Sequence, residues 1–164
     1  MTIRAWKAVF VAIFSAMALI YALQNVANLG GGMYASFAYV LGQADHAAYP
    51  ESIFPAIHSP LLIWFALLTV LLLEFACAGL TGLGAWRMWR ARQASGSDFR
   101  TACLPALNGL GVAVLVWMLL FGTFGGALFQ MWQNQVGSGS ANGAFQLTVY
   151  ALLLFGLLSM PEPS

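Results

Sequence analysis

Four long apolar runs, separated by shorter polar or glycine-rich segments, dominate the sequence. They cover residues 8–28, 60–86, 104–129 and 144–160. Each has the length of about 17 residues or more that an α-helix needs to cross the hydrocarbon core of a bilayer. The prolines of residues 161–163 cannot continue the last helix. The pattern predicts an all-α integral membrane protein with four transmembrane helices.

The connecting segments predict how these helices are joined. Residues 29–59 contain a glycine triplet, several aromatic residues, prolines and acidic residues, which favours an outer loop with one short helix at headgroup level. Residues 87–103 are predicted as a second loop, and residues 130–143 as a third with a Gly/Ser turn at 137–140. Short connections favour antiparallel neighbours, so we expect an up-down-up-down bundle.

Basic residues form two clusters beside the apolar runs. The six are Arg4, Lys7, Arg87, Arg90, Arg92 and Arg100. An excess of Lys and Arg in short loops marks the cytoplasmic side of a membrane. We therefore predict that both termini and residues 87–103 are cytoplasmic. Residues 29–59 carry only acidic charges and are placed outside.

Tryptophan stands beside arginine at the end of the second run, which is typical of a helix end at the membrane interface. We expect the indole rings at headgroup level and the arginine heads at the lipid phosphates. The residues predicted as interface anchors are Arg4, Lys7, Trp86, Arg87, Trp89, Arg90 and Arg92.

Composition agrees with a membrane protein and excludes some partners. The chain is 61% hydrophobic and 7% charged, against about 25% charge in an average soluble domain. Its 164 residues leave room for one membrane domain, 1–164, and no separate soluble domain. The bilayer is the first partner. A net charge of +1 without a basic stripe excludes nucleic acid. Cys77 and Cys103 are expected as buried thiols rather than a disulfide.

The first apolar run also has the form of a signal peptide, because Arg4 and Lys7 precede it. No clear small-x-small cleavage site follows its core. A retained helix is therefore the favoured interpretation.

Glu74 is the only acidic or basic side chain well inside a predicted span. It lies about 20 Å along the helix from either end of its run, near the bilayer midplane, where an ionised carboxylate is costly. Asn108, Thr123 and Ser15 are the candidate partners on other helices. A neutral acid hydrogen-bonded between helices is favoured. A role with a proton, ion or cofactor is the alternative, followed by lipid contact or a subunit contact.

The two histidines are candidate ligands for haem or a metal ion. His46 and His58 precede the second span, so they do not face each other in the membrane as axial haem ligands must. Asp45 and Glu51 complete an outer group with no common metal-ligand spacing, and a solvated polar loop is favoured. We predict no metal and no cofactor. The candidate functional polar residues are Glu74, Asn108 and His58.

Two further patterns lie on the second and third runs, an aromatic stripe and pairs of small residues. Trp117, Phe121, Phe124 and Phe129 could line a groove for a quinone or a lipid, although an aromatic stripe at helical spacing favours packing. Small residues suited to close helix packing stand in the pairs Ala78 and Gly82, Gly109 and Ala113, and Gly122 and Gly126.

Amide side chains crowd around a tryptophan just after the third run, at Gln130, Gln133, Asn134 and Gln135. They fit a helix end that meets water. The sharper alternative is a surface for an outer domain or partner subunit, formed by Gln130, Trp132, Gln133 and Asn134.

The order of these features resembles a bacterial family described as predicted small integral membrane proteins. The landmarks that carry the resemblance are Asn25, Phe37, Val40, Ile57, His58, Glu74, Gly84 to Arg87, Gly125, Gly126, Met131 to Gln133, Ala144 and Phe145. The chain departs from the family pattern at Ala127 and Leu128, where an acidic and an aromatic residue are usual, and at residues 137–139, where a Trp-Asn-Gly turn is usual. The resemblance implies a four-helix protein of the inner (plasma) membrane and supplies no activity or cofactor.

Three functions remain open at this point. The favoured one is a non-enzymatic accessory or scaffold subunit of a larger inner-membrane complex, for example a respiratory one, or a self-associating bundle. The second is a small oligomeric transporter or channel that uses Glu74. The third is a quinone- or haem-binding electron carrier.

Overall fold

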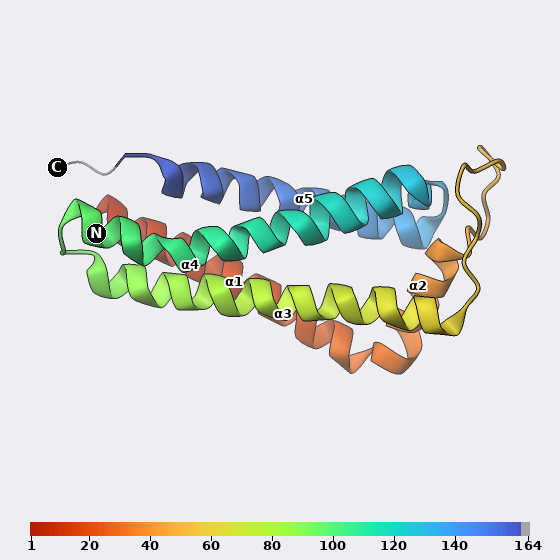
Figure 1. The fold of residues 1–164 in the computed structure, drawn as a ribbon, viewed down its shortest axis with the longest axis horizontal. Helices are drawn as coiled ribbons and strands as arrows, with labels where there is room; N and C mark the ends of the chain where they lie inside the picture. Colours follow the sequence, from red (N-terminus) through yellow and green to blue (C-terminus); the bar gives the residue numbers. More distant parts are fainter. Residues whose placement is uncertain (162–164) are drawn as a thin grey trace.

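The computed structural model describes residues 1–161, and its four long helices run side by side along the longest axis of the molecule (Figure 1). Every regular element among these residues is helical. Each of the four long helices is apolar enough to cross a membrane. The predicted all-α fold with four spans is therefore confirmed. Glu162 and Pro163, which we expected beyond the last helix, lie outside the described residues.

The long helices alternate in direction. Their bounds are Ile3–Ala27 for α1, Pro60–Ala91 for α3, Gly96–Val114 for α4, Leu115–Leu128 for its continuation η2, and Gln135–Ser159 for α5. The short elements are η1 (Leu29–Met33), α2 (Tyr34–Leu41) and η3 (Met131–Gln133). The N-terminus, the α3–α4 turn and the end of α5 share one end of the bundle, which we call the arginine side (Figure 1). The opposite end, with the other connections, is the loop side. That the arginine side is cytoplasmic stays a prediction from charge.

Two predicted loops are wrong for most of their length. Within 87–103, the helix α4 already begins at Gly96, because the Ser95 hydroxyl accepts a hydrogen bond from a backbone amide of its first turn at 3.2 Å. The Gly/Ser turn expected at 137–140 is the start of α5, capped in the same way by Asn134 at 2.7 Å. Ser95 and Asn134, which lie in the predicted loops, are therefore N-caps.

Glycine allows α3 and α4 to approach closely on the arginine side. A Cβ added at Gly84 would lie 2.4 Å from the backbone nitrogen of Ala106, and one at Gly109 would lie 2.8 Å from that of Thr81. Neither distance is tolerable for a real side chain. Small residues therefore set this contact, as is common between helices in lipid.

The other predicted small-residue pairs have different outcomes. Ala78 and Ala113 are buried, and Gly82 approaches α1, where a Cβ would lie 2.9 Å from the Ser15 hydroxyl oxygen. The pair Gly122 and Gly126 was wrongly predicted as a helix contact. A Cβ at either position would meet only carbonyls of its own helix, at 3.6 and 3.5 Å.

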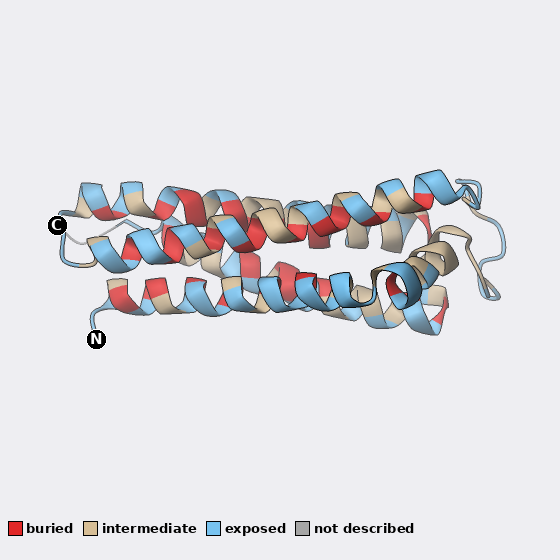
Figure 2. Cartoon of the chain, turned by 90° about the horizontal axis from the view of Figure 1, so that it is seen from below, coloured by how far each residue is buried: buried red, intermediate tan, exposed pale blue. Residues whose placement is uncertain are grey.

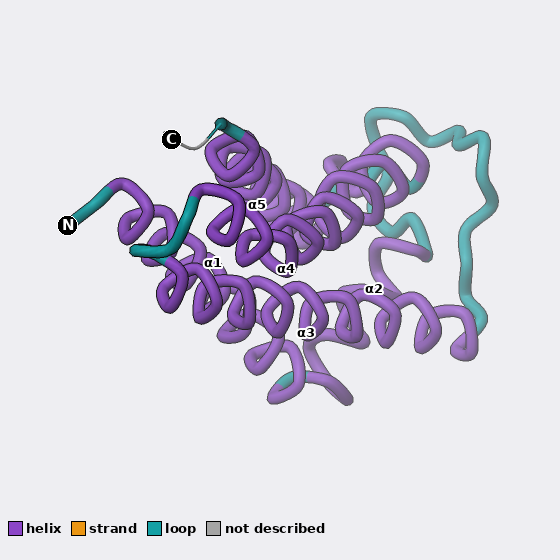
Figure 3. The backbone as a smooth tube through the Cα atoms, turned by 60° about the vertical axis from the view of Figure 1, so that its left-hand side comes forward, coloured by secondary structure: helices purple, strands orange, loops and turns teal. Residues whose placement is uncertain are grey.

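Toward the loop side, α3 and the α4–η2 helix diverge, and the short helix α2 lies between them (Figure 3). The segment η2 is π-helical, with hydrogen bonds that reach five residues back. The amide of Phe129 donates to the carbonyl of Phe124 at 2.8 Å, and the Thr123 hydroxyl donates to the carbonyl of Met118 at 3.3 Å. Such wide helical turns occur frequently at functional sites.

The buried positions of the long helices face one another inside the bundle (Figure 2), and many large apolar side chains are exposed on the outer faces. Phe65, Leu72 and Phe145 are each 70% exposed. A soluble monomer rarely exposes so much apolar surface. These faces therefore suit contact with lipid chains, as the four apolar spans require.

Candidate functional site

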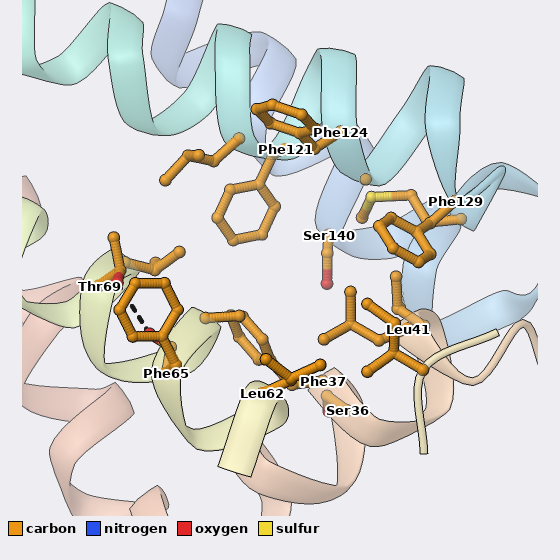
Figure 4. Close-up of a pocket in the computed structure, with 17 residues that line it drawn as sticks. Ser36, Phe37, Leu41, Leu62, Phe65, Thr69, Phe121, Phe124, Phe129 and Ser140 are labelled. Atoms are coloured by element: carbon orange, nitrogen blue, oxygen red, sulfur yellow. Dashed lines mark hydrogen bonds between the residues drawn. The ribbon is translucent and has the colours of Figure 1, made fainter. Parts of the chain in front are cut away.

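An apolar pocket of about 340 Å³ lies on the loop side, where α3 and η2 diverge (Figure 4). Five phenylalanine rings contribute to its wall. They are Phe37 on α2, Phe65 on α3, Phe121 and Phe124 on η2, and Phe129 just after η2. None of the described residues that line the pocket is charged.

Helical spacing explains which residues reach the pocket. On α3 the lining positions are 62, 65, 66, 69 and 70, and on η2 they are 120, 121, 124 and 125. Residues three and four apart share one face of a helix, so each helix presents one apolar stripe. Ser36, Phe37, Val40 and Leu41 form the equivalent stripe on α2.

Three hydroxyl groups are the polar side chains of the lining. Ser36 donates to the carbonyl of Gly32 at 2.7 Å, and Thr69 donates to that of Phe65 at 2.7 Å (dashed in Figure 4). Ser140 on α5 donates to a carbonyl of its own helix at 3.1 Å. Each hydroxyl proton is thus engaged by the backbone four residues earlier, and the remaining lone pairs can only accept.

The connecting loop, residues 42–59, closes the end of the pocket on the loop side. Ile57 belongs to the lining, and its amide donates to the carbonyl of Leu41 at 2.8 Å. The ring of Phe54 packs edge-on against Phe129 with 5.4 Å between centroids. The pocket is therefore covered toward the water at this end of the bundle.

The aromatic residues of the third run lie partly in the pocket and partly in the core of the bundle. Phe121, Phe124 and Phe129 line the pocket, as the groove interpretation expected. Trp117 does not join them: it is buried in the core and meets Phe14 of α1 edge-on at 6.1 Å. Its role is helix packing.

Glu74 belongs to α3, and its side chain lies in the contact with α1, where the residue is only 3% exposed. Its Oε2 accepts a hydrogen bond of 2.8 Å from the side-chain amide of Asn25. Asn25 was not among the expected partners, because it follows the most apolar part of the first run. The helix nevertheless continues to Ala27. The place of Asn25 inside the predicted span 8–28 was the available signal.

The three expected partners of Glu74 lie elsewhere. Ser15 donates to the carbonyl of Ala78 at 2.8 Å and so forms a second link between α1 and α3. Thr123 bonds within η2, and Asn108 is exposed on α4. The predictions of these partners were wrong. Distance along a helix gives the depth of a residue in the membrane, but it gives neither the burial of the side chain nor the direction in which it points.

The histidines remain near the loop side. His58 is exposed and lies beside Gly42, where a Cβ would be 3.4 Å from the imidazole Cε1. His46 is partly buried in loop 42–59, and within the described residues neither of its ring nitrogens has a hydrogen-bond partner. No three His, Cys, Asp or Glu side chains of residues 1–161 gather as a metal site would need.

The amide side chains that follow the third run form hydrogen bonds with the connecting loop. Gln133 accepts from the amide of Tyr49 at 2.7 Å and donates to the carbonyl of Tyr49 at 3.1 Å, so one side chain pairs with both backbone groups of one residue. It also donates to Gln130 at 2.5 Å, and Asn134 caps α5. Trp132 is exposed and meets the Tyr49 ring edge-on at 5.5 Å. These amides act within the chain, and Tyr49 was not foreseen as their partner.

Arginine and tryptophan are stacked on the arginine side. Arg90 lies over the Trp86 ring at 5.4 Å, and Arg92 lies over the Trp89 ring at 4.6 Å. Arg4 lies over Phe99 and donates to a carbonyl of the α3–α4 turn at 2.8 Å. Arg87 is exposed beside these groups. The arrangement suits an interface between lipid and water.

Lys7 differs from the other predicted anchors, because it is only 4% exposed. It belongs to the inward stripe of α1, at helical spacing from Val11, Phe14 and Ala18, which are buried as well. Lys7 was predicted as an interface anchor, and its burial among the helices leaves little of its side chain to contact lipid. The stripe itself was readable from the sequence.

Comparison with known proteins places the chain in a family. Neither the comparison with curated proteins nor that with solved structures found a match. The model of the family described as "Predicted small integral membrane protein (DUF2165)" matches residues 3–161. This range covers the four long helices, the connecting loop and the pocket. The chain therefore belongs to this family of predicted small integral membrane proteins.

Proposed function

We propose that the protein is a non-enzymatic accessory subunit of a larger membrane complex, and that it contributes by holding a lipophilic molecule in the pocket. The observation that carries the proposal is the pocket itself. Its volume of about 340 Å³ falls within the range of small-molecule sites, roughly 300–1,000 Å³. Its aromatic, uncharged lining favours an apolar ligand.

The polar groups of the site favour binding over catalysis. Ser36, Thr69 and Ser140 each bond to the backbone carbonyl four residues earlier in the chain. A catalytic hydroxyl needs a neighbouring base that takes its proton. None of the described lining residues is an acid, a histidine or a lysine. The site is therefore suited to holding a molecule rather than to transforming it.

The placement of Glu74 favours a structural role over transport. Its carboxyl accepts from Asn25 inside the α1–α3 contact, and it does not line the pocket. A coupled transporter would use such an acid in a water-filled path. In proteoliposomes, a flux that disappears in Glu74→Gln would favour the transporter instead.

Ligand binding is tested on protein purified in a mild detergent. We expect native mass spectrometry to find one lipophilic molecule per chain that survives exchange into a second detergent. Ala66→Phe places a ring in the pocket and should abolish this adduct. Ala12→Phe adds the same ring to an exposed position of α1 and should leave it. An adduct equal in all three proteins, or in none, would exclude the pocket as a binding site.

Membership of a complex needs a separate measurement. Affinity purification from native membranes in the same detergent should yield stoichiometric membrane partners. A chain that runs alone at its own mass, while keeping its ligand, would remove the accessory role and leave the binding role.

A further inference from the structure

We infer that the pocket takes an acyl chain of a membrane phospholipid, which enters sideways from the bilayer, rather than the ring of a quinone. This inference rests on the proposed function, because it names the class of lipophilic molecule. Three properties of the pocket lead to it: the direction of its hydrogen bonds, its size and the position of its opening.

The hydrogen-bonding groups do not suit a quinone ring. The two carbonyl oxygens of a quinone are acceptors and need donors in a site that excludes water. The hydroxyls of Ser36, Thr69 and Ser140 already donate to the backbone and offer acceptors only. A ring carbonyl would meet acceptors or phenylalanine rings. A hydrocarbon chain has no such requirement.

The size suits part of one chain. A methylene group occupies about the volume of a water molecule, roughly 30 Å³ in the liquid, so a space of about 340 Å³ holds on the order of ten such groups. This is less than a whole phospholipid. We therefore expect one chain to be seated by about half its length, with the rest and the headgroup outside the pocket.

The opening points to the bilayer. The most exposed lining residues are Leu62 and Phe65 on α3 and Phe124 on η2. Ile57 and the contact of Phe54 with Phe129 cover the pocket toward the water at the loop side. A ligand already dissolved in the membrane reaches the site without leaving the bilayer. This route fits a phospholipid of the leaflet on the loop side.

Photolabelling tests where the chain binds. The protein is placed in nanodiscs of phosphatidylethanolamine and phosphatidylglycerol, with a small fraction of phospholipid carrying a diazirine in the middle of one acyl chain. After irradiation, we expect peptide mapping to find adducts concentrated at Phe65 and Phe124. Labelling at these positions should fall at least fivefold in Ala66→Phe and stay unchanged in Ala12→Phe. Uniform labelling of all outer helix faces in the wild type would overturn the inference.

Competition separates the ligand classes. An excess of unlabelled phospholipid should reduce the label at Phe65 and Phe124, whereas a quinone with a single isoprene unit should not. If the short quinone competes and the phospholipid does not, the inference fails while the proposed binding function survives. A long isoprenoid alcohol that competes far better than phospholipid would replace the phospholipid as occupant. Specific labelling that no competitor reduces would count against both.

Thr69→Val provides a check that does not depend on blocking the pocket. It removes the hydroxyl and nearly keeps the shape. Because the Thr69 proton already bonds to the carbonyl of Phe65, phospholipid labelling should change less than twofold. A loss of fivefold or more would mean that this hydroxyl contacts a polar ligand group, which contradicts a purely hydrocarbon occupant.

Discussion

Replacement of Asn25 by leucine should destabilise the protein, because it removes the donor to a buried carboxyl oxygen. The hydrogen bond from Asn25 to Glu74 measures 2.8 Å and joins α1 to α3. Asn25 itself is half-buried, so a leucine can extend toward lipid without a clash. The main effect of the substitution is therefore on Glu74.

The expected magnitude follows from the burial of the acceptor. Hydrogen bonds between transmembrane helices contribute about 0.6 kcal/mol on average and up to about 1.7 kcal/mol. An acceptor left without its donor costs about 1–3 kcal/mol where water cannot replace it. Glu74 is only 3% exposed, which limits access of water. We expect a loss of about 1–2 kcal/mol in the free energy of unfolding, a five- to thirtyfold change in the folded-to-unfolded ratio.

The assay is reversible unfolding by SDS in mixed micelles, followed by tryptophan fluorescence. Gln24→Leu is the matched control, because Gln24 is the exposed neighbour of Asn25 on α1. A double-mutant cycle with Glu74→Leu should give a coupling energy of about 1 kcal/mol. Glu74→Gln keeps an acceptor oxygen and should cost less than about 0.5 kcal/mol.

Two results would refute this reasoning. An Asn25→Leu variant as stable as Gln24→Leu, with no coupling to Glu74, would mean that the hydrogen bond contributes nothing to the α1–α3 contact. A large loss in Glu74→Gln would mean that the carboxyl group does something that an amide cannot do. The second outcome would favour a role in proton or ion binding.

Three further outcomes are expected. Gly84→Leu should cost about 3 kcal/mol in the same SDS titration, because its side chain would enter the backbone of α4; Gly79→Leu, which points into open space, should be near neutral. Gln133→Leu should release the connecting loop and speed its proteolysis at least tenfold, and an unchanged rate would show that the paired hydrogen bonds do not hold the loop. With the native cysteines replaced, thiols introduced as Ser97→Cys and Glu51→Cys should react with an impermeant maleimide from opposite sides of the membrane, the second from outside; reaction from one side would refute the topology.

The four crossings could be predicted because an apolar run of this length can cross a bilayer only as an α-helix. A helix satisfies its backbone internally, and the bilayer offers no other partner for it. The alternating order follows from the short connections. The helix ends were harder, since Ser95 and Asn134 act as caps through single hydrogen bonds that a list of turn-forming residues does not reveal.

Contacts between helices could be predicted only in part. Lys7 lies on the inward stripe of α1, but it was predicted as an interface anchor because it is charged and precedes the apolar run. The pairing of Asn25 with Glu74 depends on how far α1 continues and how it crosses α3. The pocket was foreseen only as an aromatic stripe on the third run. Its other walls come mainly from α3 and α2. The wide turn at Leu29–Met33 places α2 beside α3, and no local pattern encodes that position.

The close contact on the arginine side and the pocket on the loop side have one geometric cause. At Gly84 the axes of α3 and α4 approach as closely as backbone atoms permit. Thr69 lies 15 residues away, or about 22 Å along α3 at about 1.5 Å per residue. A crossing of about 20° moves one axis roughly 8 Å sideways over that length, which lengthens the distance between the axes by roughly 3 Å. The side chains of α3 and η2, together with α2, fill the added space only in part. A larger residue at the glycine contact should therefore change the pocket as well as the stability, and lipid labelling at Phe65 in Gly84→Ala would measure the link.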